Sequence, residues 1–252
     1  MTFPRSFLFL GLSVALGMEI VFQATELFAQ TLPLSDNLTS LISPEGQALL
    51  LQSEAQVDYT PLMSQFITQK NGAFCGVAST VMVLNALNVA SPLAPEWGRG
   101  YFTQDNIFNE QTEAVIPLRT IARQGMTLAE LAGMFEAYPV TATVHHGADL
   151  ELDEFRSVLA TNLAEPDNFV VVNYLRRAIA QESGGHISPL AAYDEDTDQF
   201  LILDVSRYKY PPVWVSAEEL WQATNTIDSV SGKTRGVVLV APELSAGPDL
   251  ED

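Results

Sequence analysis

The amino-acid sequence predicts an α+β fold, with a helical N-terminal half packed on an antiparallel sheet in the C-terminal half. Up to about residue 165 most apolar residues recur at helical spacing. Beyond it, short β-branched and aromatic runs are separated by turn signals. Helices followed by hairpin-connected strands indicate the α+β class. The 252 residues can build one sizeable core, so one domain is expected.

The predicted helices begin at recognisable capping residues. Ser43, Pro44 and Glu45 open the first, because Ser caps the free N–H groups and Pro tolerates the first helical position. Capping boxes, which pair a Ser or Thr with a Glu three residues later, open the helices at Thr127 and Ser216. The predicted helices after the first cover about 60–68, 75–87, 127–137, 151–163 and 216–224.

The predicted strands lie mostly in the second half. They cover 140–145, 169–174, 187–193, 199–205 and 235–240. The polar stretch 194–198 is a turn signal between two of them and predicts a hairpin. In that hairpin the start of one strand lies beside the end of the next.

Charge and the N-terminal sequence limit the partners and the location. The net charge of −19 argues against nucleic acid, which needs a cationic surface, and against an anionic membrane face. Residues 1–29 carry one early positive charge and then an apolar run, which is typical of an export signal. Cleavage would place the protein outside the cytoplasm. The alternatives are an uncleaved short anchor or retention in the cytoplasm.

The remaining organisation follows from composition. Residues 30–42 are polar and turn-rich and are predicted as a linker. Residues 43–241 form the main predicted domain, and residues 242–252 form an acidic tail. Half of the twelve basic residues lie in the last third of the chain and are interpreted as solvated surface charges. Arg235 is the exception, because it directly precedes an apolar strand.

Cys75 is the only cysteine, so it cannot form an internal disulfide. It serves either as a packed residue or as a nucleophile. It lies at the predicted start of a helix, where the helix dipole favours the thiolate. A nucleophile also needs a base, a group that orients the base, and donors for the oxyanion.

His186 and Asp204 are the candidates for base and orienting group. Counted from the 194–198 turn, they fall roughly opposite each other, and a buried carboxylate needs a partner. A structural loop histidine is the alternative for His186. Gln69 could donate to an oxyanion together with the backbone N–H of Cys75, although an exposed helical glutamine is its simpler interpretation. The chain order Gln, Cys, His, Asp is that of papain-like cysteine peptidases, with Asp in place of the usual Asn.

Several segments together resemble the catalytic domain of phytochelatin synthases over about residues 55–240. They are AFCGVAS at 73–79, VNYLR at 172–176, GHISP at 185–189 and ILDV at 202–205. The resemblance implies a papain-like fold, the triad Cys75, His186 and Asp204, and Gln69 at the oxyanion hole. It implies substrate-binding positions at Arg235, Asn173 and Tyr174, with no role assigned to the last two. It also implies γ-glutamylcysteinyl transfer from glutathione.

The implied activity is a glutathione γ-glutamylcysteinyltransferase with hydrolase activity, linked to heavy-metal detoxification. No cofactor is expected to be required. Cd²⁺ or Zn²⁺ would enter as a metal–glutathione thiolate substrate, and no protein metal site is expected. The alternatives are a papain-like peptidase acting on another peptide outside the cytoplasm, and a binding module in which Cys75 is only packed. The sequence fixes neither the ratio of hydrolysis to transfer nor whether the protein is a homodimer.

Overall fold

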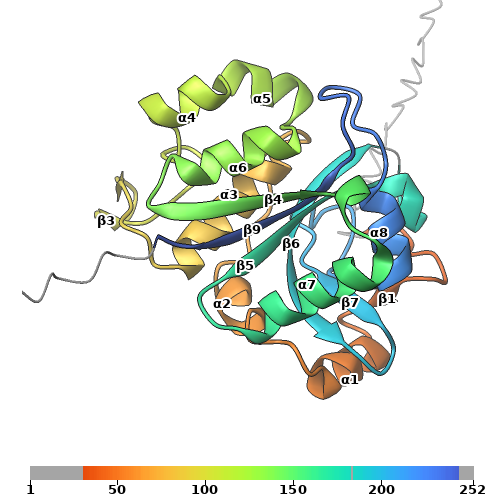
Figure 1. The fold of residues 1–252 in the computed structure, drawn as a ribbon. Helices are drawn as coiled ribbons and strands as arrows, with labels where there is room; N and C mark the ends of the chain where they lie inside the picture. Colours follow the sequence, from red (N-terminus) through yellow and green to blue (C-terminus); the bar gives the residue numbers. More distant parts are fainter. Residues whose placement is uncertain (1–30, 183, 244–252) are drawn as a thin grey trace, which may run out of the picture.

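A seven-stranded antiparallel sheet organises the computed structural model, which describes residues 31–182 and 184–243 (Figure 1). Its strand order is β1-β8-β7-β6-β5-β9-β4. The strands are β1 (Thr39–Ser40), β4 (Val140–His146), β5 (Phe169–Leu175), β6 (Gly185–Asp194), β7 (Gln199–Ile202), β8 (Val213–Ser216) and β9 (Gly236–Pro242). A separate two-stranded ribbon pairs β2 (Leu93–Ala94) with β3 (Arg99–Gly100).

Helices cover both faces of the sheet (Figure 1). The helices are α1 (Pro44–Gln52), α2 (Tyr59–Ser64), α3 (Cys75–Ala86), α4 (Glu110–Val115), α5 (Leu118–Gln124), α6 (Leu128–Glu136), α7 (Leu152–Ala164) and α8 (Ala217–Thr224). One core cluster joins α3 and α6 to one face, and a second joins α7 and α8 to the other. Among the described residues, no helix is long and apolar enough to cross a membrane.

Helix α3 is buried along most of its length, which holds its N-terminus in place. Every residue from Cys75 to Leu84 is buried. Its polar side chains are satisfied locally, since the Ser79 and Thr80 hydroxyls each donate to a helix carbonyl at 2.8 Å. Gly76 permits close packing, because a Cβ there would lie 2.3 Å from the Met126 side chain and 3.3 Å from that of Ile187. The first turn of α3 is therefore seated directly against β6.

The structure confirms the α+β class and most of the predicted elements. Ser43 caps α1, Thr127 and Glu130 form the predicted capping box of α6, and Ser216 caps α8. The 194–198 turn joins β6 and β7 as predicted. The division into a helical half and a strand half is too simple, because α7 and α8 pack on the second face of the sheet.

Several segments differ from the sequence prediction. Most of the predicted linker, 31–42, packs on the domain: Leu38 and Leu41 are buried, and β1 pairs with β8. Strand β8 itself was not expected, and the helix predicted over 60–68 ends at Ser64. The predicted leader (1–29) and nearly all of the acidic tail (242–252) lie outside the described residues.

Candidate active site

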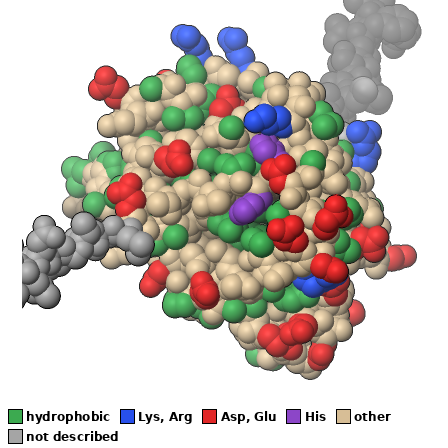
Figure 2. All heavy atoms as spheres, viewed as in Figure 1, with side chains coloured by type: hydrophobic (Ala, Val, Ile, Leu, Met, Phe, Trp, Pro, Cys, Tyr) green, Lys and Arg blue, Asp and Glu red, His purple; other side chains and the backbone are tan. Residues whose placement is uncertain are grey.

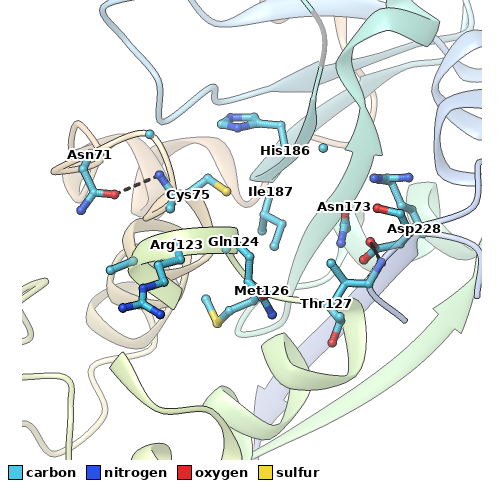
Figure 3. Close-up of a pocket in the computed structure, with 18 residues that line it drawn as sticks. Asn71, Cys75, Arg123, Gln124, Met126, Thr127, Asn173, His186, Ile187 and Asp228 are labelled. Atoms are coloured by element: carbon cyan, nitrogen blue, oxygen red, sulfur yellow. Dashed lines mark hydrogen bonds between the residues drawn. The ribbon is translucent and has the colours of Figure 1, made fainter. Parts of the chain in front are cut away.

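Cys75 begins α3 and lines a cavity of about 560 Å³ (Figure 3). The tight turn before it is built by Asn71, whose side-chain oxygen accepts from the N–H of Ala73 at 2.9 Å. The Asn71 carbonyl accepts from the N–H of Phe74 at 3.2 Å. These bonds aim the free end of α3, with its unsatisfied N–H groups, toward the cavity.

The Cys75 thiol is buried and contacts His186. Burial alone raises the thiol pKa, but the hydrogen bond and the charge of His186 lower it. Hydrogen bonds from the backbone N–H groups of Ile187 and Gly76 lower it further. The pKa of Cys75 therefore lies below its ordinary value, which favours a thiolate.

His186 lies at the start of β6 and is held by two groups through Nε2. Asp204 Oδ1 lies 2.8 Å from this atom, and Ser188 Oγ lies 2.9 Å from it. Nδ1 is then the ring nitrogen that remains for the thiol. Burial opposes the imidazolium, yet the charge of Asp204 outweighs it and raises the pKa of His186. Both pKa shifts move the two side chains toward a thiolate–imidazolium pair.

The predicted hairpin does bring His186 and Asp204 together, although by a shifted register. A bulge between Leu190 and Ala192 displaces the pairing of β6 with β7. Extending the register beyond the bulge sets Asp204 across from Ser188. His186 lies two residues before Ser188, on the same face of β6. The strand β7 ends at Ile202, so Asp204 lies in the segment after it.

Arg176 is the main residue of the site that sequence reasoning missed. Its interpretation as a solvated surface charge is wrong, because its side chain is 4% exposed. Its Nη1 and Nη2 donate to the two oxygens of Asp204 at 2.8 and 2.9 Å. It also contacts Gln181 and lies over the ring of Tyr210. Burial opposes ionisation of Asp204, but His186 and Arg176 outweigh it, and its pKa falls below the usual range.

Gln69 lies beside this network, but its amide is already engaged. Its Nε2 donates to the carbonyl of Asn71 at 2.6 Å and to the Tyr208 hydroxyl at 3.2 Å. Its Oε1 accepts from Ser206 Oγ at 2.8 Å. Gln69 is buried rather than an exposed helical residue, and it does not line the cavity. Donation to an oxyanion would require the amide to exchange one of these bonds.

Asn173 and Tyr174, neighbours on β5, face opposite sides of the sheet. Asn173 lines the cavity, opposite Ile187 of β6. Tyr174 is fully buried and does not line it, so its predicted place among the substrate-binding residues is not supported. It packs edge-on against His186 with ring centroids 5.7 Å apart. This contact supports the histidine ring on one side.

Arg235 lines the cavity from the segment that precedes β9. Its Nη1 donates to the carbonyl of Ile227 at 2.8 Å, while Nε is buried with no hydrogen-bond partner among the described residues. Burial lowers its pKa, and the charge of nearby Asp228 opposes this. A Cβ on Gly185 would lie 3.0 Å from Arg235 Nη2, so a glycine there gives the guanidinium its room.

A buried cysteine at a helix N-terminus, paired with a histidine that a carboxylate orients, is the arrangement of a protein with a cysteine nucleophile. Among the described residues, no group of three or more His, Cys, Asp or Glu side chains is placed to hold a metal ion. The phytochelatin synthase family model matches residues 29–237. The chain belongs to the phytochelatin synthase family.

Curated relatives and one solved structure are similar to this chain. A glutathione gamma-glutamylcysteinyltransferase of Lotus japonicus is 33% identical over 85% of the chain and 42% of its own length. A glutathione gamma-glutamylcysteinyltransferase of Arabidopsis thaliana is 30% identical over 85% of this chain and 44% of its own length. That of Schizosaccharomyces pombe is 29% identical over 76% of this chain and 45% of its own length. The chain thus spans less than half the length of these relatives. Xylellain, a cysteine protease from Xylella fastidiosa, aligns with a TM-score of 0.40 and 12% identity over 78% of this chain and 89% of its own.

Proposed function

We propose that this protein is a glutathione γ-glutamylcysteinyltransferase that also hydrolyses glutathione through an acyl-enzyme on Cys75. The observation that carries the proposal is the buried relay from Cys75 through His186 to Asp204 at one cavity, in a chain of this family. The names of the relatives supply the substrate class.

Acylation begins with attack of the Cys75 thiolate on the carbonyl carbon of the Cys–Gly peptide bond. The backbone N–H of Cys75, at the free end of α3, supports the oxyanion, and Gln69 would join it by releasing one of its present bonds. The C–N bond then breaks, and the His186 imidazolium gives its proton to the departing glycine nitrogen. The product is a γ-Glu-Cys thioester on Cys75 and free glycine.

Deacylation runs the same chemistry with a new nucleophile. His186, now neutral, accepts a proton from water or from the α-amine of a second glutathione while that group attacks the thioester carbonyl. The C–S bond breaks and restores the thiolate–imidazolium pair. Water yields γ-Glu-Cys, and the amine yields a peptide longer by one γ-Glu-Cys unit.

The charged wall formed by Arg235 and Asp228 suits the γ-Glu end of the substrate. That end carries an α-carboxylate and an α-ammonium group on one carbon. Arg235 supplies a guanidinium and Asp228 a carboxylate at the same cavity. A buried guanidinium with an unpartnered Nε gains from an incoming anion, so this wall favours a zwitterion over an uncharged peptide end.

Heavy-metal ions enter this proposal only as part of the substrate. Cd²⁺ and Zn²⁺ prefer thiolate ligands, which glutathione provides. Such a complex would present the same γ-Glu and glycine ends to the cavity as free glutathione.

The test is glycine release from glutathione by the purified chain. Cys75→Ala should lower the rate by more than about a thousandfold, because the nucleophile is removed. Mass spectrometry of wild-type protein mixed with substrate should find an adduct of γ-Glu-Cys mass on Cys75.

Two controls separate this activity from ordinary peptide cleavage. The α-linked Glu-Cys-Gly peptide has the same composition but lacks the γ-linked zwitterion, and it should be a much poorer substrate. Equal cleavage of both peptides would favour a general papain-like peptidase. Unchanged glycine release by Cys75→Ala would refute the proposal.

A further inference from the structure

We infer that Arg123 forms a second carboxylate-binding position in this cavity, which holds the α-amino-acid group that leaves during acylation and the one that enters during transfer. The inference rests on the proposed function and adds a position that determines specificity on the leaving-group side of Cys75.

Arg123 lies in the last turn of α5, and it lines the same cavity as Cys75. Its side chain is exposed and makes no ion pair or hydrogen bond with any other described residue. Many acidic and few basic side chains cover the face shown in Figure 2, consistent with the net charge of −19. The unpaired guanidinium of Arg123 therefore attracts anions to this cavity wall, although the protein as a whole carries a strong negative charge.

Among the described residues two arginines line the cavity, and they lie on different sides of the nucleophile. In Figure 3, Arg123 lies on one side of Cys75 together with Asn71, and Asp228 lies on the other. Arg235 belongs to the Asp228 side, because it bonds to the carbonyl of Ile227. A substrate whose scissile carbonyl sits over Cys75 can then place one charged end at Arg235 and the other at Arg123.

Glutathione has a charged group at each end, and the chemistry fixes which end meets Arg123. If the γ-Glu end lies at Arg235, the glycine carboxylate lies on the Arg123 side. The departing glycine is an α-amino acid, with its amine at the reacting carbonyl and its carboxylate one carbon away.

The acceptor in transfer has the same reacting unit. The γ-Glu end of a second glutathione also carries an amine and a carboxylate on one carbon. Because transfer is acylation run backwards with a different amine, the entering amine occupies the place that the glycine amine left. One arginine can therefore bind the carboxylate of the departing glycine and the carboxylate of the entering glutathione. Water has no carboxylate and does not use this position.

The first experiment compares glutathione with its C-terminal glycinamide, which lacks only the terminal charge. The wild-type kcat/KM for glycine or glycinamide release should favour the acid by about tenfold, as expected for one charge-assisted hydrogen bond. Arg123→Gln should remove that preference by slowing the acid alone, and Arg123→Lys should keep part of it. Arg119→Gln is the matched control, since Arg119 is exposed on the same helix and does not line the cavity.

The second experiment tests whether Arg123 binds the amino acid that enters during transfer. Wild-type protein acylated from glutathione should incorporate isotope-labelled glycine back into glutathione. In Arg123→Gln the ratio of labelled glutathione to γ-Glu-Cys should fall about tenfold, because the entering glycine uses the carboxylate-binding position and water does not.

The outcomes are distinct. A wild type that releases glycine but does not prefer the acid would overturn the assignment of Arg123, as would an Arg123→Gln variant that slows acid and amide equally. A wild type that releases no glycine at all would instead count against the proposed function.

Discussion

Two buried aspartates in this molecule differ in the partners that surround them. Asp204 is fully buried and accepts hydrogen bonds from Arg176, His186 and the backbone N–H of Ser206. Asp58, which precedes α2, is 1% exposed, and neither of its oxygens has a hydrogen-bond partner among the described residues. The pKa of Asp204 is lowered by its partners, whereas burial raises that of Asp58 to about 8.

The difference shows that partners, rather than burial, decide whether a carboxylate is charged in this fold. Asp204 stays ionised at neutral pH and can stabilise an imidazolium on His186. Asp58 is protonated at neutral pH and offers no charge. The same residue type thus serves the site at one position and costs stability at the other.

Removing Arg176 should bring Asp204 closer to the state of Asp58, and it should have the largest effect on stability. Arg176→Met leaves a buried carboxylate with part of its hydrogen bonding gone, which costs about 3–5 kcal/mol. Urea unfolding at pH 7 measures the loss. Arg177→Met is the matched control, because Arg177 is the exposed neighbour, and its effect should stay within about 0.5 kcal/mol. Equal stability of the two variants would show that Asp204 does not depend on Arg176.

Asp58→Asn should have the opposite effect, because the amide removes an ionisable group from a site without partners. The unfolded chain releases the Asp58 proton above about pH 4, while the folded protein keeps it up to about pH 8. The folded state then binds more protons, so the stability of the wild type falls as pH rises through this window. Relative to Asp58→Asn, it should fall by about 1 kcal/mol per pH unit, or on the order of 3 kcal/mol at pH 7.

Unfolding curves at pH 4.5, 6 and 7.5 test this dependence. A difference between Asp58→Asn and wild type that does not change with pH would mean that Asp58 has a partner in solution. Glu54→Gln is a useful control, because Glu54 is an exposed acid in the same region, and its effect should be small at every pH.

The sequence predicts features that depend on local chemistry. Ser43 and Thr127 mark helix starts because capping is decided by neighbouring residues. The hairpin with its 194–198 turn predicts that His186 and Asp204 meet, since turn and alternation fix which strand ends lie together. The bulge near Leu190 escapes prediction because no residue in it signals an extra position.

What the sequence does not predict depends on contacts between distant segments. Arg176 follows an apolar strand like many surface arginines, and only the folded chain shows that it reaches Asp204. Asp58 has the sequence position of a helix cap, yet its side chain makes no capping bond. The docking of 31–42 depends on β8, a strand of four residues whose short apolar run is too brief to predict.

The smallest of the predicted effects is the influence of the Asp204 charge on the reactivity of Cys75. Asp204→Asn removes the charge that raises the pKa of His186, so less imidazolium is present at pH 6 to stabilise the thiolate. An ordinary cysteine would be roughly 0.3% thiolate at that pH, so wild-type alkylation by iodoacetamide should be much faster than that fraction predicts. In Asp204→Asn it should slow by about tenfold, because a smaller fraction of the thiol is ionised at that pH.

Because Cys75 is the only cysteine, the mass of one adduct reports the reaction directly. Asp198→Asn is the matched control: Asp198 pairs with Arg156, on the surface rather than in the Asp204 network. Its loss should leave the alkylation rate unchanged. If Asp204→Asn also leaves it unchanged, the thiolate depends on the helix end and the N–H groups of Ile187 and Gly76. The charge of Asp204 would then act on His186 alone, as an orienting group for proton transfer.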